Sequence, residues 1–253
     1  MTEVLLECLD GIAVITMNRP NARNAVNGAM AVQLAAAFQE LDDRPDLHTA
    51  VLTGAGGTFC AGMDLKAFRT GERSTVEGRG FAGLVERPPN KPLIAAVEGH
   101  AVGGGFEIVL ACDLVVAGRS ASFGLPEVRR GLVAAGGGLL RLPRRIPYHQ
   151  AMELALTGQP MGAPRARALG LVNQIADDGQ ALAVARRLAA LVGANAPLAI
   201  AATKRIVHQS TDWPSEEAFA CQDLIVEPVR QSQDAREGTA AFVQKRTPAW
   251  HGR

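Results

Sequence analysis

Short, almost continuously apolar segments that alternate with helix-like segments constrain the fold of this chain most strongly. Residues 50–53, 92–97 and 114–117 are apolar runs of strand length, and residues 104–111 form an apolar run with the length of a short helix. Strands that are apolar throughout are buried on both faces, as they are in sheets flanked by helices. The alternation therefore predicts an α/β protein with buried strands.

The N-terminal part of the chain predicts a hairpin followed by an amphipathic helix. Residues 4–8 and 12–17 are two strand-like segments joined by a turn at Asp10-Gly11. Beyond them, apolar residues recur every three or four positions between residues 30 and 41.

From about residue 180 the pattern changes to helices alone. Residues 182–192, 197–210 and 215–230 each read as a helix, and Pro197 and Pro214 occupy positions where helices can begin. The sequence therefore predicts a core of about 190 residues followed by a mostly helical tail.

The bulk composition excludes several classes of partner. The 253 residues are 47% hydrophobic and carry a formal net charge of +1, so nucleic acid and anionic membrane surfaces are not expected as partners. No apolar run approaches the roughly 20 residues that span a bilayer. The start of the chain also lacks the basic-then-apolar pattern of a signal peptide.

The cysteines and histidines show no spacing typical of a metal or redox site. The four cysteines are scattered, at Cys8, Cys60, Cys112 and Cys221, and five histidines are present. We expect buried free thiols and no metal ion. Together with the composition, this predicts a reduced, cytoplasmic protein of enzyme size.

Two glycine-rich segments, residues 59–66 and 99–107, each lie between a predicted strand and a predicted helix. Glycines let another group approach the backbone closely, and the free N–H groups of a helix's first turn can face an anionic oxygen. Two such donors from separate segments would form an oxyanion hole. Alternatively, these glycines serve only close packing of helix on strand, and the residues themselves leave both explanations open.

Phosphate-binding motifs fit these segments poorly. The Walker motif has Lys-Ser or Lys-Thr after its second glycine, which neither segment has. The dinucleotide fingerprint G-x-G-x-x-G differs from Gly99 followed by the contiguous glycines 103–105. A nicotinamide-dependent dehydrogenase, which would bind NAD(H), is the alternative enzyme class.

Two glutamates in apolar surroundings are the candidate acid and base. Glu107 lies within an apolar helical segment, and Glu127 follows the apolar residues 123–126. Burial disfavours the charged form of a carboxyl group, so its pKa can rise toward the working pH. The alternative is that each glutamate simply forms an ion pair with a neighbour such as Arg129 or Arg130.

Five segments, in order along nearly the whole chain, resemble those of the crotonase (enoyl-CoA hydratase/isomerase) superfamily. FCAGMDLK at residues 59–66 is similar to the family's CoA-binding and oxyanion segment, and AVGGGFE at residues 101–107 to its second oxyanion segment with a catalytic glutamate. FGLPE at residues 123–127 resembles the segment of the second glutamate. Residues 15–25 resemble the family's opening and residues 242–246 its closing helix.

The resemblance implies an α/β fold built as a spiral of repeated ββα units with a C-terminal helical region. It places the core with the CoA-thioester site at residues 1–195 and a helical trimerisation region at residues 196–253. The implied assembly is a homotrimer, which can pair into a dimer of trimers. The substrate is an acyl-CoA thioester, and no cofactor is needed because coenzyme A is part of the substrate.

The resemblance also assigns roles to individual residues. Met63 and Gly104 match the two oxyanion-hole positions, whose backbone N–H groups hold the thioester oxygen. Glu107 and Glu127 match the catalytic glutamates. Residues at positions that contact substrate or CoA are Ala22, Arg23, Ala61, Gly62, Asp64, Leu65, Gly103, Pro126, Phe242 and Lys245. The last two approach the adenine end of CoA, from the same or a neighbouring subunit.

The pair of glutamates favours reversible hydration of a 2-enoyl-CoA, with Glu107 acting on the water and Glu127 supplying the proton. The alternatives are double-bond isomerisation, another lyase or hydrolase reaction of the superfamily, and non-catalytic acyl-CoA binding. Ala134-Ala135 replaces the Pro-Gly pair of many hydratases, and Met63 replaces a smaller residue. Residues 80–84 and 245–253 resemble carnitinyl-CoA dehydratases, so the acyl group stays open.

Overall fold

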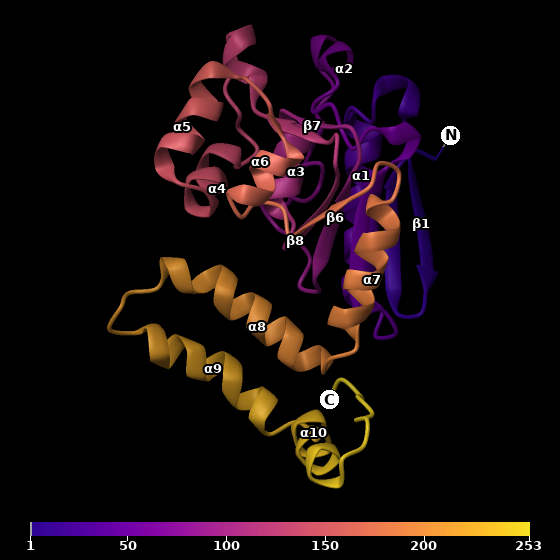
Figure 1. Ribbon diagram of the computed structural model, residues 1–253, viewed down its shortest axis with the longest axis vertical. Coiled ribbons are helices and arrows are strands. Elements are labelled where there is room, and N and C mark those ends of the chain that lie inside the picture. The colour runs from indigo at the N-terminus through magenta and orange to yellow at the C-terminus, as the bar shows by residue number, and fades with distance from the viewer. Residues whose placement is uncertain (1) are drawn as a thin grey trace.

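A six-stranded sheet forms the centre of the main body of the computed structural model, which describes residues 2–253 (Figure 1). The strand order is β1-β2-β3-β6-β8-β11; β1 and β2 pair antiparallel, and all later neighbours pair parallel. The strands are β1 (Val4–Leu9), β2 (Ile12–Met17), β3 (Thr49–Gly54), β6 (Leu93–Val97), β8 (Leu114–Gly118) and β11 (Gln174–Ala176). The antiparallel pair β1–β2 confirms the predicted hairpin. The prediction of buried central strands is also confirmed, because β6 is buried along its whole length.

Short strands form a second, three-stranded sheet, which we call the second layer. Its members are β7 (His100–Val102), β9 (Ser122–Gly124) and β10 (Met161–Gly162), in the order β10-β9-β7. Cys60 extends this layer through a parallel bridge to Ala101. Each long strand β3, β6 and β8 is thus followed by a short segment of the second layer and then by a helix, which is the ββα repeat that the family resemblance implies.

Helices cover both faces of the large sheet. On one face, α7 (Ala181–Gly193) packs on β3, β6 and β8 through alanines spaced four residues apart, which allow close approach. On the other face, α1 (Gly28–Asp43) buries its apolar side, and Asn27 caps its start by accepting a hydrogen bond from Met30 N. The helix predicted from residues 30–41 is therefore confirmed.

The remaining elements of the core surround the ends of the second-layer strands. They are η1 (Pro20–Ala22), η2 (Ala55–Gly57), α2 (Leu65–Arg69), the hairpin β4 (Thr75–Val76) and β5 (Gly80–Phe81), α3 (Gly104–Ala111), η3 (Pro126–Arg130), α4 (Gly138–Arg145), α5 (Tyr148–Thr157) and α6 (Ala163–Ala168). Of these, α2, α3, η3 and α4 carry the candidate site.

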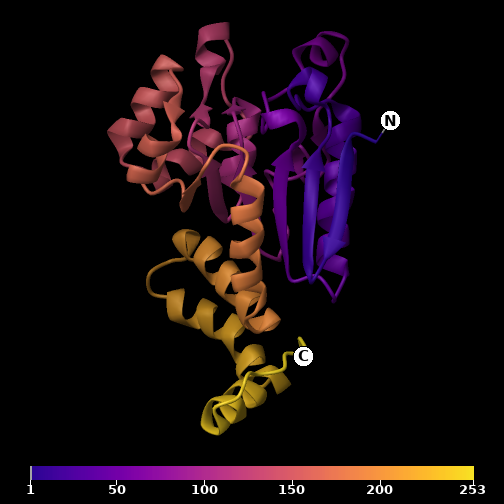
Figure 2. The ribbon, with the colours of Figure 1, turned by 45° about the vertical axis from the view of Figure 1, so that its right-hand side comes forward.

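A helical tail extends away from the main body (Figures 1 and 2). It contains α8 (Pro197–Gln209), η4 (Ser210–Asp212), α9 (Ala218–Arg230) and α10 (Gln233–Gln244). Pro197 begins α8 as predicted, whereas the helix predicted from residue 215 begins at Ala218, because Pro214 O accepts from Glu217 N and closes a turn first. The division of the chain at residues 195/196 stays a prediction.

The exposure of the cysteines and the lengths of the helices test two further expectations. Cys60 and Cys112 are buried, as expected, whereas Cys221 is only partly buried and Cys8 is exposed because β1 is an edge strand of the sheet. The expectation of buried thiols is therefore wrong for Cys8 and Cys221. No single helix within residues 2–253 is long and apolar enough to cross a bilayer. Only α7 and α8 taken together meet that criterion, and they are bent by 106°.

Candidate active site

The two glycine-rich segments converge at the ends of neighbouring second-layer strands. One segment leaves the layer at Cys60 and the other at Val102, and a bridge joins Cys60 to Ala101. A side chain at Gly62 would place its Cβ 2.9 Å from Val102 O and 3.1 Å from Gly104 N. Gly62 also has a φ of +92°, so glycine is needed there both for conformation and for space.

Among residues 2–253, no other backbone group accepts a hydrogen bond from the N–H of Met63 or Gly104. Gly62 O and Asp64 N both bond to Val26, so the N–H of Met63, between them, points away from that bridge. Gly104 is the first residue of α3 and has no helical carbonyl one turn earlier to receive its N–H. Both residues line the same cavity, which therefore has two free donors in its wall.

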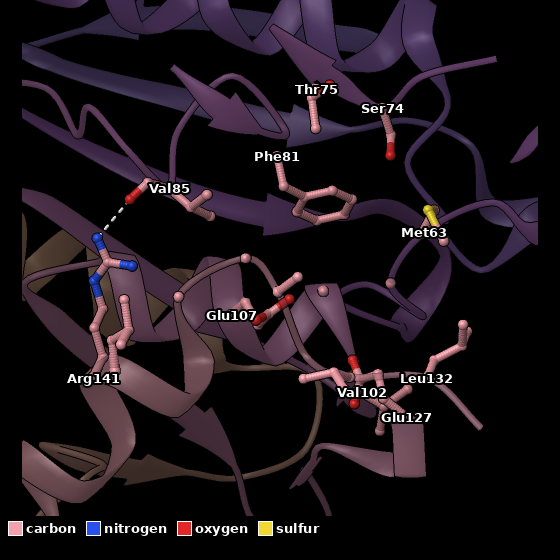
Figure 3. A pocket seen from close by; sticks show the side chains of 18 of the residues that line it. Met63, Ser74, Thr75, Phe81, Val85, Val102, Glu107, Glu127, Leu132 and Arg141 are labelled. Carbon is pink, nitrogen blue, oxygen red and sulfur yellow. Dashed lines mark hydrogen bonds between the residues drawn. The ribbon is translucent and has the colours of Figure 1, made fainter. Parts of the chain in front are cut away.

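This cavity has a volume of about 850 Å³ and lies between the second layer and the β4–β5 hairpin (Figure 3). Nine of the residues predicted for the site line it: Ala61, Gly62, Met63, Leu65, Gly103, Gly104, Glu107, Pro126 and Glu127. In Figure 3, Met63 lies to one side of Glu107, and Val85 and Arg141 lie to the other. The tail reaches the cavity through His208 and Asp212, and Arg144 of α4 forms an ion pair with Asp212.

The wall opposite the glutamates comes from residues to which the sequence assigned no place in the site. Ser74, Phe81 and Val85 are buried and face the cavity. The ring of Phe81 lies against Gly104, where an added Cβ would come within 2.5 Å of it. The apolar run at residues 81–85, within an otherwise polar stretch, is the signal in the sequence that could have identified this wall.

Glu107 is almost completely buried, with 4% of its surface exposed. Its Oε1 accepts a hydrogen bond of 2.9 Å from Gly138 N, and a Cβ at Gly136 would come within 2.6 Å of its Oε2. Burial raises the pKa of Glu107 above its usual value, and the charge of Glu127 adds to this effect. The amides of Gly138 and Gly136 and the charge of Arg141 act in the opposite direction.

Glu127 is half-buried and lies against Gly103, the residue that precedes α3. A Cβ at Gly103 would lie 3.0 Å from its Oε1, while its buried Oε2 has no hydrogen-bond partner in the described chain. Burial raises the pKa of Glu127, against the opposing charge of Arg130. No ion pair within residues 2–253 involves either glutamate, so pairing with Arg129 or Arg130 does not explain them.

The enoyl-CoA hydratase/isomerase family matches residues 7–253 of the chain. The chain belongs to this family. A crystal structure of enoyl-CoA hydratase from Mycobacterium tuberculosis has 58% sequence identity, covers 99% of both chains and gives a TM-score of 0.98, which confirms the crotonase-like fold. The enoyl-CoA hydratase EchA19 of the same organism is 43% identical over 99% of this chain and 97% of its own length. Carnitinyl-CoA dehydratase of Escherichia coli is 42% identical over 96% and 95%, respectively.

Three further residues assigned from the crotonase resemblance lie beside the cavity without lining it. Asp64 caps α2 by accepting bonds from Lys66 N and Ala67 N, and it forms an ion pair of 3.0 Å with Arg19. Ala22 and Arg23 lie at the end of η1, where Arg23 O accepts a bond from Ala61 N. These contacts hold the segment that leads into the oxyanion position.

Phe242 and Lys245 lie far from the cavity of their own chain. Phe242 lies in the last turn of α10 and Lys245 directly follows this helix, at the far end of the tail (Figure 1). Phe242 is 86% exposed, and neither residue lines the cavity. One chain alone therefore does not bring these two predicted residues to the site.

The burial of Glu107 predicts a pH-dependent effect of replacing it by glutamine. Because its folded-state pKa is raised, the folded state binds the proton more tightly than the unfolded state, and stability falls as pH rises through the window above 4.5. Glutamine keeps the acceptor for Gly138 N but carries no charge. We expect Glu107→Gln to raise the melting temperature at neutral pH and to change it little below pH 4.5, as measured by thermal unfolding over a pH series. An effect that is equal at all pH values would assign the change to packing instead.

Proposed function

We propose that this protein is an enoyl-CoA hydratase that adds water reversibly to the double bond of a 2-enoyl-CoA thioester. The observation that supports this most directly is one cavity with two free backbone N–H groups and two carboxyl groups without ion-pair partners. The relatives named as enoyl-CoA hydratases, which match over nearly the full chain, support the same reaction.

The N–H groups of Met63 and Gly104 act on the thioester oxygen. Attack of water on the β-carbon moves negative charge onto that oxygen as an enolate forms. Donors fixed in the backbone stabilise this charge more in the transition state than in the ground state, and therefore lower the barrier. Loss of one such donor typically costs roughly 3–4 kcal/mol of transition-state stabilisation.

The two glutamates move the protons. Glu107 takes a proton from the attacking water, and Glu127 gives a proton to the α-carbon; water and proton add to the same face, and in the reverse direction the two roles exchange. Their raised pKa values, caused by burial, bring both groups closer to the pH at which acid and base catalysis are effective. The reaction needs no cofactor, because coenzyme A enters with the substrate.

The CoA moiety extends from the cavity past Ala61, Asp64 and Leu65, and past the η1 residues Ala22 and Arg23. Phe242 and Lys245 contact the adenine end of CoA from a neighbouring subunit of a homotrimer, which can pair into a dimer of trimers. The exposure of α10 at the far end of the tail supports this arrangement, because its apolar side chains Phe242 and Val243 are 86% and 74% exposed.

The deciding experiment follows the loss of enoyl absorbance across a panel of short, long, branched and polar 2-enoyl-CoAs. We expect hydration of at least one member, with the product identified as the 3-hydroxyacyl-CoA by mass spectrometry. A shifted double bond without water addition would indicate an isomerase, and free CoA would indicate a hydrolase. Tight thioester binding without turnover of any member would indicate a binding protein.

A further inference from the structure

Arg141 spans the wall of the cavity and ties two distant segments together. It belongs to α4, and its Nη2 donates a hydrogen bond of 2.5 Å to the carbonyl oxygen of Val85 (Figure 3). Val85 is 3% exposed and ends the buried run that forms the wall opposite the glutamates. The bond therefore fixes this wall relative to the helix that follows the glycines around Glu107.

The backbone before α4 leaves room for this guanidinium at Gly137, between the two glycines that contact Glu107. Gly137 has a φ of +88°, and a Cβ there would overlap Nη1 of Arg141. The glycines on either side, Gly136 and Gly138, lie against the carboxyl group of Glu107, so a side chain at either position would clash with it. Three consecutive glycines thus leave room for one carboxylate and one guanidinium in the same cavity wall.

The charges that face these two groups come from several elements. Glu107 faces Glu127 from η3 and Arg141 from α4. Arg141 faces Glu107 from α3 and Arg145 from its own helix. No carboxylate of the described residues lies within 4 Å of the Arg141 guanidinium. Its charge therefore stays available to the cavity, and it favours the ionised form of Glu107 against the effect of burial.

We infer that Arg141 is a positioning residue that holds the acyl-pocket wall at Val85 and places a positive charge in the wall that carries Glu107, where it favours the base form needed for water addition. The inference rests on the proposed hydratase function for its kinetic consequences. Its electrostatic part concerns Glu107 alone and is measurable without turnover.

The variants Arg141→Met and Arg141→Lys separate the two parts of this role. Methionine removes both the charge and the bond to Val85, and we expect kcat/KM to fall about 10²-fold, as is typical when a catalytic group loses its geometry. Without the cation, the charged form of Glu107 is less favourable. The acid limb of the kcat/KM profile therefore moves to higher pH. Lysine keeps a charge without the planar fork, so it should retain the acid limb and lose mainly the geometry.

Arg145→Met is the matched control. Arg145 lies on the same helix and donates to a backbone oxygen, that of Cys112, but it does not line the cavity. If Arg141 only stabilised the fold, both methionine variants would lower the melting temperature and leave the pH profile in place. Guanidinium ion added to the Arg141→Met variant should restore part of kcat/KM, and it should not affect the Arg145→Met variant.

Titration of Glu107 by ¹³C NMR tests the inference independently of activity. The signal is assigned with Glu107→Gln, and the midpoint is compared between wild type and Arg141→Met. A midpoint that moves to higher pH supports the inference even if no enoyl-CoA is hydrated, which would overturn only the proposed reaction. An unchanged midpoint together with an unchanged acid limb would overturn the inference for Arg141.

Discussion

Glu107→Gln and Glu127→Gln each lower kcat for hydration of the preferred 2-enoyl-CoA by about 10²–10⁴-fold, the usual contribution of a positioned acid or base. Each variant keeps the shape of the side chain and the backbone around it, because glutamine can still accept the bond from Gly138 N at position 107. The loss therefore falls on kcat, while the affinity for a CoA thioester that cannot react stays near that of wild type.

Glu98→Gln serves as the control for this pair. Glu98 is a half-buried carboxylate that accepts a bond from Ala181 N outside the cavity, so its replacement should leave kcat unchanged. Steady-state kinetics of all three variants, with binding measured by calorimetry, distinguishes the possibilities. Full activity in one of the two cavity variants would mean that a single carboxyl group carries the proton transfers, as in an isomerase.

Gly62→Ala lowers kcat by about 10²–10³-fold, the effect of losing an oxyanion donor. The new Cβ would lie 2.9 Å from Val102 O and 3.1 Å from Gly104 N, so the two segments must separate. Separation moves the N–H groups of Met63 and Gly104 away from a common oxygen. The loss in kcat is measured by steady-state kinetics with the preferred 2-enoyl-CoA.

Gly71→Ala is the control for this change. Gly71 also has a positive φ, of +83°, but a Cβ there meets nothing within 4 Å, so it adds the same kind of backbone strain without crowding. Both variants should therefore lose some stability in thermal unfolding, and only Gly62→Ala should lose kcat. Equal kcat in the two variants would show that the convergence at Gly62 does not set the oxyanion geometry.

The elements of the fold were largely predictable because their signals are local. Strands β3, β6 and β8 are apolar along their length, and α1 has apolar residues at helical spacing. Each pattern follows from burial of the element itself and needs no knowledge of its neighbours. The exposure of Cys8 was missed because an edge strand and a central strand look alike when only one strand is considered.

The candidate site was predictable where its residues belong to recognisable segments. Glu107 and Glu127 were identified from their apolar neighbours and from the family resemblance, and the structure brings both into one cavity. Phe81, Val85 and Arg141 were not identified as site residues, although the segment 80–84 was noted for its resemblance to carnitinyl-CoA dehydratases. Their place in the cavity depends on a hairpin that folds back over α3 and on the seat that Gly137 provides, and neither is a property of the residues themselves.

By itself, the sequence determined the type and order of the elements, the identity of the two glutamates and the family, because each depends on local pattern or on a run of residues. Only the tertiary structure decided that the segments at Gly62 and Gly104 meet, that both glutamates lack ion-pair partners and that Phe242 lies away from the cavity. Those facts are distances between residues remote in the chain, and they arise from how the ββα units stack and from which backbone positions leave no room for a side chain.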